Sequence, residues 1–93
     1  MAHEGYHEPI EEITNKTRDM HRALVSLQEE LEAIDWYQQR IDATQDPGLV
    51  KILEHNRDEE KEHAAMLIAW ICKHDPVFEQ EVRSRLTPAA KNP

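Results

Sequence analysis

Residues 43–48, which read ATQDPG, separate two long helical patterns and thereby set the topology of the chain. Asp46 is a good acceptor for the free amides at the start of a helix. Pro47 suits the first helical position, because the N–H that proline lacks needs no partner there. A helix that ends near Thr44 and another that begins at Pro47 leave only one or two residues between them. A connection that short folds the helices back as an antiparallel hairpin.

The helix before this turn is expected to run from about Pro9 to about Thr44. Its apolar residues recur at alternating spacings of three and four, which is the pattern of a helix packed in a bundle or coiled coil. The seam consists of Ile10, Ile13, Thr17, Met20, Leu24, Leu27, Leu31, Ile34, Gln38 and Ile41. Residues 1–8 precede the helix and are predicted to form a flexible polar tail.

The helix after the turn is expected to reach about His74. An Asp-Pro pair at residues 75–76 repeats the same start signal and predicts a short helix that ends near Leu86. Residues 87–93 contain two prolines and little that is bulky and apolar, so they are predicted to form a flexible tail. The folded unit is therefore expected to comprise residues 9–86.

The composition predicts an all-α fold. Only two glycines occur, and the five prolines lie where they would begin or follow helices without breaking them internally. A single hairpin would leave its apolar seam uncovered, and a second hairpin is the simplest cover. We therefore expect a four-helix bundle that forms only when two copies pair.

The excess of acidic over basic residues limits the classes of molecule that the chain can be expected to bind. With 19 acidic and 11 basic residues the net charge is −8, which repels phosphate backbones, so no nucleic-acid partner is expected. No apolar run approaches the roughly 20 residues needed to span a bilayer, and the N-terminal residues show no signal-peptide pattern. Cys72 is the only cysteine, so neither an intrachain disulfide nor a cysteine-based zinc motif can form. We expect a soluble cytoplasmic protein with no membrane partner.

The second helix carries polar residues in the middle of its seam, where a core would place leucines. Glu60 and His63 form a Glu-x-x-His unit, and a spacing of three turns both side chains toward one side of an α-helix. Burying these groups without partners is costly, and a bound metal ion can compensate for that cost. Glu30 lies as far before residue 45 as Glu60 lies after it, so the hairpin should bring Glu30 level with the pair.

One chain thus offers two glutamates and one histidine, which is half of the ligand set of ferritin-like di-iron and di-manganese bundles. Two chains would supply the whole set. Carboxylate and imidazole ligands suit iron and manganese and also zinc, so these residues alone leave the metal open. Two irons bridged by carboxylates can each pass one electron to dioxygen, and apolar layers around them would limit the access of water.

Other interpretations of the same residues stay open at this point. The polar seam positions could simply fix the register of the helices, as a buried Asn does in coiled coils. A metal-dependent assembly module would bind ions that staple an interface, without any redox step. A manganese-binding or peroxide-using relative of the bundle would differ only in its metal and its oxidant.

Two longer segments carry a more specific signal. They read EELEAIDWY at residues 29–37 and HNRDEEKEHAAM at residues 55–66. Both resemble the signature segments of the encapsulated ferritins, which are ferroxidase cargo proteins of encapsulin nanocompartments. The resemblance extends over about residues 8–86, and it implies a ferritin-like bundle that oxidises Fe(II) to Fe(III) with dioxygen at a di-iron centre between two subunits.

The resemblance also implies roles for single residues. Glu30, Glu60 and His63 would be the iron ligands of the catalytic centre, with Glu60 bridging the two irons across a two-fold dimer interface. Tyr37 would be the aromatic residue beside that centre.

A second, metal-attracting site is implied as well. Glu29, Glu32 and Trp36 match its positions in the family, and it would bind calcium or other divalent ions. The resemblance further implies a ring-shaped homodecamer, held in the cytoplasm inside an encapsulin shell that receives the oxidised iron. Family members usually carry a C-terminal targeting peptide, and none precedes Pro93 here, so we expect either another route to the shell or a longer natural chain.

Overall fold

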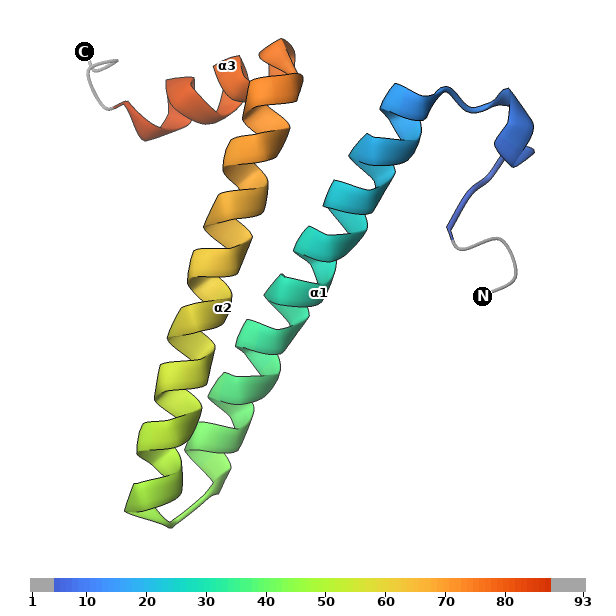
Figure 1. The fold of residues 1–93 in the computed structure, drawn as a ribbon. Coiled ribbons are helices and arrows are strands. Elements are labelled where there is room, and N and C mark those ends of the chain that lie inside the picture. Colours follow the sequence, from blue (N-terminus) through green and yellow to red (C-terminus); the bar gives the residue numbers. More distant parts are fainter. Residues whose placement is uncertain (1–4, 88–93) are drawn as a thin grey trace.

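The computed structural model describes residues 5–87, which form one short 3-10 helix and three α-helices (Figure 1). The 3-10 helix η1 spans Ile10–Glu12, and the α-helices are α1 (Asn15–Ala43), α2 (Pro47–His74) and α3 (Pro76–Leu86). No strand occurs among these residues, which confirms the predicted all-α class. Parts of both predicted tails, residues 1–4 and 88–93, lie outside the described part of the chain.

The first long helix begins later than the sequence pattern indicated. Pro9 precedes only η1, after which Ile13 takes an extended conformation (φ −102°, ψ 125°). Thr14 then caps α1, because its side-chain oxygen accepts a hydrogen bond from the Thr17 amide at 3.2 Å. A threonine side chain can satisfy a free amide of the first turn and a proline cannot, so α1 starts after Thr14. Ile10 and Ile13 therefore lie before α1 and do not extend its seam.

The turn between α1 and α2 forms as predicted. The Asp46 carboxylate accepts a hydrogen bond from the Gly48 amide at 2.9 Å, and Pro47 is the first residue of α2. Thr44 ends α1, and its hydroxyl oxygen accepts a hydrogen bond from the Asp46 amide at 3.2 Å. These local bonds satisfy backbone groups at both helix ends, and they leave α1 and α2 antiparallel.

The short helix α3 leaves the hairpin at an angle and packs on α2 (Figure 1). Asp75 has an extended conformation (φ −139°, ψ 95°), which ends α2. Its carboxylate also accepts a hydrogen bond from the Phe78 amide at 3.0 Å, which begins α3. A single aspartate thus ends one helix and caps the next.

The hairpin has a thin core. The buried apolar residues of the described chain are Ala23, Leu53, Ala64 and Ile71. The radius of gyration is 17.5 Å, whereas a compact domain of this length would have about 12 Å. The smallest dimension is 16 Å, so the helices lie in a single layer.

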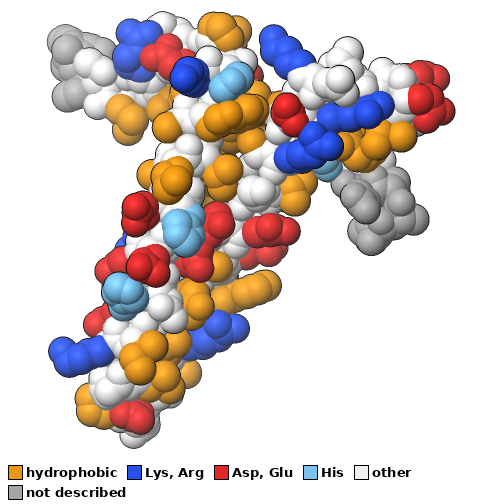
Figure 2. All heavy atoms as spheres, in the orientation of Figure 1, with side chains coloured by type: hydrophobic (Ala, Val, Ile, Leu, Met, Phe, Trp, Pro, Cys, Tyr) orange, Lys and Arg blue, Asp and Glu red, His pale blue; other side chains and the backbone are white. Residues whose placement is uncertain are grey.

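Large apolar side chains remain exposed along that layer. They are Ile10, Leu24, Leu31, Trp36, Leu49, Ile52, Met66, Val77, Phe78 and Leu86. On the face drawn in Figure 2, acidic side chains gather around the middle of the hairpin, with hydrophobic side chains visible toward both ends. Exposed apolar surface of this extent is typical of proteins that associate, and it supports the prediction that a second copy covers the seam. Within the described residues, no helix is long and apolar enough to cross a membrane.

Candidate metal centre

Glu30, Glu60 and His63 meet near the middle of the hairpin. Glu30 comes from α1, and the other two come from successive turns of α2. His63 Nδ1 lies 3.1 Å from Glu60 Oε1 and 3.5 Å from Glu30 Oε1. One possible ligand atom from each residue lies within 4.8 Å of the other two. The three residues are therefore level with one another, as the position of the turn predicted.

This cluster lies at the edge of the contact between α1 and α2. The side chains of Glu30 and Glu60 are 25% and 22% exposed, whereas that of His63 is 47% exposed. The carboxylates are thus partly enclosed between the helices, and the imidazole is at the rim. Leu31 follows Glu30 in the chain, Met66 is one turn beyond His63, and both are exposed apolar residues. The surroundings of the cluster are suited to contact with another molecule.

The pKa values of the three side chains depend on one another. The pKa of Glu30 is raised, first by its hydrogen bond with Glu60 and then by burial, which disfavours the charged carboxylate. The pKa of Glu60 is lowered, chiefly because it accepts the hydrogen bond from Glu30. The pKa of His63 is raised, chiefly by its hydrogen bond with Glu60. In this arrangement protons supply the positive charge that two neighbouring carboxylates require.

The ligand set suits a divalent transition metal. Two carboxylates and an imidazole are the oxygen and nitrogen donors that iron, manganese and zinc accept. Donors bound at about 2.0–2.2 Å from one ion lie at most about 4.4 Å apart, so atoms within 4.8 Å need only small side-chain adjustments. The described residues contain no second group of three such donors.

Glu29, Glu32 and Trp36 are exposed side chains of α1. In the described part of one chain, neither glutamate belongs to a group of three potential metal ligands. Trp36 instead lines a shallow hollow of the α1 surface together with Arg40 and Ala43. The metal-attracting role of Glu29, Glu32 and Trp36 stays a prediction.

The ring of Tyr37 is half-buried, and the Arg40 guanidinium carbon lies 5.5 Å from its centroid. Tyr37 is two turns beyond Glu30, which places its backbone about 10 Å farther along α1. Within a single chain this ring contacts a cation of its own helix. The role of Tyr37 beside a di-iron centre stays a prediction.

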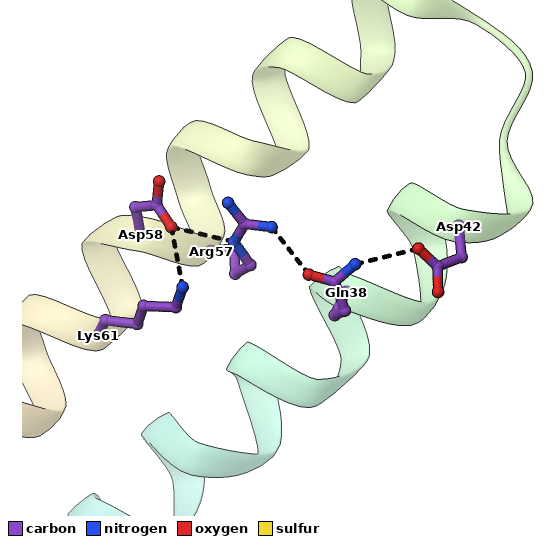
Figure 3. Close-up of polar contacts among 5 residues, drawn as sticks. All are labelled: Gln38, Asp42, Arg57, Asp58 and Lys61. Atoms are coloured by element: carbon purple, nitrogen blue, oxygen red, sulfur yellow. Dashed lines mark hydrogen bonds and ion pairs between the residues drawn. The ribbon is translucent and has the colours of Figure 1, made fainter.

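Sequence reasoning assigned no role to Arg57 and Gln38, which meet across the two helices. Arg57 Nη1 donates a hydrogen bond to Gln38 Oε1 at 2.8 Å (Figure 3). The available signal was Gln38 itself, a polar residue in a mostly apolar seam. Nothing in the spacing pointed to Arg57 as its partner, because the two residues are 19 positions apart.

Comparison with known proteins places the chain in a family. The EncFtn-like family model matches residues 5–88. An encapsulated ferritin-like protein of Rhodospirillum rubrum is 54% identical over 80 residues, which are 86% of this chain and 57% of that protein. The encapsulin nanocompartment cargo protein EncC of Myxococcus xanthus is 42% identical over 52 residues, which are 56% of this chain and 40% of that protein.

A solved structure shares the fold. The crystal structure of a Nitrosomonas europaea protein matches with a TM-score of 0.82 and 59% identity, over 86% of this chain and 88% of that one. The chain spans about half of the length of the Rhodospirillum and Myxococcus relatives. The region matched by the family model includes Glu30, Glu60, His63 and all three α-helices. The chain therefore belongs to the EncFtn-like family of encapsulated ferritin-like proteins.

Proposed function

We propose that this chain is a ferroxidase, which oxidises Fe(II) to Fe(III) with dioxygen at a di-iron site completed by two copies. The observation that carries the proposal is the convergence of Glu30, Glu60 and His63. Membership of the EncFtn-like family supports the same activity. The names of the relatives, an encapsulated ferritin-like protein and a nanocompartment cargo protein, support an encapsulin shell as the partner that stores the iron.

A second copy is needed because one chain holds too few ligands for two ions. Metal ions in protein sites generally bind four or more ligands, and the cluster offers three residues. A copy related by a two-fold axis would add the same three residues from the facing hairpin. The pair would then hold two single glutamates and two Glu-x-x-His units. The same contact would cover Leu31 and Met66, which are exposed beside the cluster.

The residues of the cluster suit this reaction. Fe(II) is the substrate, and dioxygen accepts one electron from each of the two ferrous ions held side by side. Glu30 and Glu60 balance the positive charge of the ions and keep them close together. The raised pKa values of His63 and Glu30 mean that each group keeps its proton to higher pH than usual, and metal binding displaces any proton that it still holds. Protons displaced in this way are released beside the dioxygen, whose reduction consumes protons.

Aerobic addition of Fe(II) to the purified protein tests the proposal, with Fe(III) formation followed by absorbance and dioxygen uptake measured in parallel. We expect oxidation that is faster than in buffer. Glu60→Gln and His63→Gln should each lower the initial rate by at least about tenfold, because each removes one ligand from both halves of a two-fold site.

The matched control is Glu62→Gln, which makes the same change of charge at an exposed residue of α2 outside the cluster. Its rate should stay near that of the wild type. A wild-type rate no higher than that of buffer would refute the ferroxidase proposal. So would equal losses in Glu62→Gln and Glu60→Gln, because the rate would then not depend on the cluster.

A metal-dependent assembly module is the second candidate, and the exposed apolar residues beside the cluster favour it. In such a module the bound ion would fasten two copies together without any redox step. Light scattering after size exclusion, with Zn(II), Fe(II) or chelator, distinguishes the two functions. Assembly driven by redox-inert zinc, in a protein that consumes no dioxygen when given Fe(II), would favour the module over the ferroxidase.

A further inference from the structure

The short turn at residues 44–46 sets the offset of α1 and α2 close to it, but the apolar contact between the two helices farther from the turn is thin. Its buried residues are Ala23, Leu53, Ala64 and Ile71. Burial of apolar surface is non-directional, so small shifts along the helix axis change its energy only gradually. A shift by one helical turn moves a side chain about 5.4 Å along the axis, which is enough to separate Glu30 from the ligands on α2.

A polar contact between the same two helices is directional. Arg57 Nη1 on α2 donates a hydrogen bond to Gln38 Oε1 on α1 at 2.8 Å. The Gln38 side-chain amide in turn donates to Asp42 Oδ1 at 3.0 Å, which holds its oxygen toward Arg57 (Figure 3). Although long arginine side chains usually extend into water, that of Arg57 is only 19% exposed.

The Arg57 guanidinium also bonds to a residue of its own helix, α2. Arg57 Nε donates to Asp58 Oδ1 at 3.0 Å, and Lys61 Nζ lies 3.3 Å from the same oxygen. The guanidinium is therefore bound at two positions, by a carboxylate of α2 and by an amide oxygen of α1 (Figure 3). A planar group held at two of its nitrogens has little freedom to follow a sliding helix.

We propose that Arg57 and Gln38 form a register clamp, which holds Glu30 of α1 opposite Glu60 and His63 of α2. Arg57 is one turn before Glu60, and Gln38 is two turns beyond Glu30. Helices are stiff over one or two turns, so the offset set by the clamp is also the offset of the ligands.

The clamp is a positioning device, and it rests on the proposed metal-binding function of the cluster. A guanidinium has no acceptor atom and cannot bind a metal ion. The Gln38 oxygen is already occupied by Arg57. Neither residue belongs to the cluster of potential ligands, so both would act on a metal only through the helices.

Zinc affinity of the full chain, measured by calorimetry, tests the clamp without any redox step. Arg57→Met and Gln38→Leu should each weaken zinc binding by about tenfold or more, in the range seen when groups that support metal ligands are removed. Gln38→Glu keeps an acceptor oxygen for Arg57 but loses the bond to Asp42, so its zinc affinity should lie between those of Gln38→Leu and the wild type.

Arg83→Met is the matched control. It removes a two-point contact of the same kind, in which Arg83 bonds Glu79 at 2.8 and 2.9 Å, but within α3, which does not pack on α1. Its zinc affinity should equal that of the wild type. Thermal unfolding of every variant without metal separates a loss of stability from a loss of register.

A structural readout is independent of metal chemistry. In a metal-free crystal structure of Arg57→Met, we expect Glu30 to lie farther from His63 than the present 3.5 Å and outside the 4.8 Å group. An unchanged cluster would overturn the clamp, as would a lower melting temperature with unchanged zinc affinity. Tight zinc binding that depends on the clamp, in a protein that oxidises no Fe(II), would instead refute the ferroxidase and leave the clamp in place.

Discussion

Glu30, Glu60 and His63 lie close together and are linked by hydrogen bonds. The helical repeat places Glu60 and His63 one turn apart, and the hairpin brings Glu30 within 3.5 Å of the imidazole. The hydrogen bond with Glu60 is the largest cause of the raised pKa of Glu30, and burial and repulsion between the carboxylates add to it. The hydrogen bond with Glu60 also raises the pKa of His63. A divalent ion would displace protons from these groups, which makes its affinity depend on pH.

The zinc affinity is expected to fall as the pH decreases through the raised pKa of His63, which lies above the ordinary value of 6.5. A group with a raised pKa keeps its proton to higher pH, and only the neutral imidazole can bind a metal. The zinc affinity should fall more steeply at lower pH, where Glu30, whose pKa is also raised, takes up a proton. Calorimetric titrations over a pH series, in buffers of different ionisation enthalpy, measure both the affinity and the protons released.

The control for this titration is His55→Gln. His55 pairs with Glu59 at 3.2 Å on an exposed part of α2, outside the cluster. Removing it should leave both the affinity and the proton release unchanged. A zinc affinity that is constant from below pH 6.5 to well above it would contradict the role of His63 as a ligand.

The two glutamates are expected to affect the His63 pKa unequally in the metal-free protein. The hydrogen bond with Glu60 is the largest cause of the raised pKa, while Glu30 contributes through its charge and a lesser hydrogen bond. Glu60→Gln should therefore lower the His63 pKa more than Glu30→Gln does. Titration of the imidazole signals by NMR measures both shifts, and a larger effect of Glu30→Gln would show that the order is wrong.

At the scale of single elements, aspartates define where α2 and α3 begin. Asp46 accepts a hydrogen bond from the Gly48 amide, and Asp75 accepts one from the Phe78 amide. Each aspartate is followed by a proline that opens the helix. The pattern recurs because the first amides of any helix lack partners within it, and a short acceptor side chain can satisfy one of them.

Asp46→Ala is expected to lower the free energy of unfolding by about 1 kcal/mol, because it removes the acceptor that caps α2. Urea unfolding followed by circular dichroism measures the change, at one fixed protein concentration because association also stabilises the fold. Gln45→Ala is the control, since Gln45 is an exposed neighbour in the same turn. Equal losses in the two variants would mean that the cap contributes nothing.

The hairpin is a single layer with an incomplete core. The radius of gyration is 17.5 Å, and among residues 5–87 four apolar side chains are buried, so much of the apolar seam stays in contact with water. A chain of this size gains too little from so small a core to be stable alone without further burial. Association of copies would supply that burial.

Leu31→Arg is therefore expected to shift the protein toward smaller species, because it places a charge in the exposed apolar surface beside Glu30. Light scattering after size exclusion, at several protein concentrations, measures the shift. Gln45→Arg makes the same change of charge at the exposed turn and should not alter the mass. An unchanged mass for Leu31→Arg would mean that this surface lies outside any contact between copies.

Much of the architecture follows from interactions between residues close together in the chain. The all-α class, the hairpin turn and the bounds of α2 and α3 depend on local spacing and on caps such as Asp46 and Asp75. Local patterns also predict too early a start for α1, because they point to Pro9. Only the hydrogen bond that the Thr14 side chain accepts from the Thr17 amide shows where the helix begins.

The hairpin geometry also predicted that Glu30 is level with Glu60 and His63. Each residue adds the same rise, so residues equally far from the turn in sequence lie at similar distances from it along the helices. The position of a residue along the helix axis does not specify the rotation of the helix about that axis or the rotamer of the side chain. Those are set by packing between elements, and they determine that His63 reaches both carboxylates and that Arg57 meets Gln38. Contacts of this kind join residues far apart in the chain, so no local pattern records them.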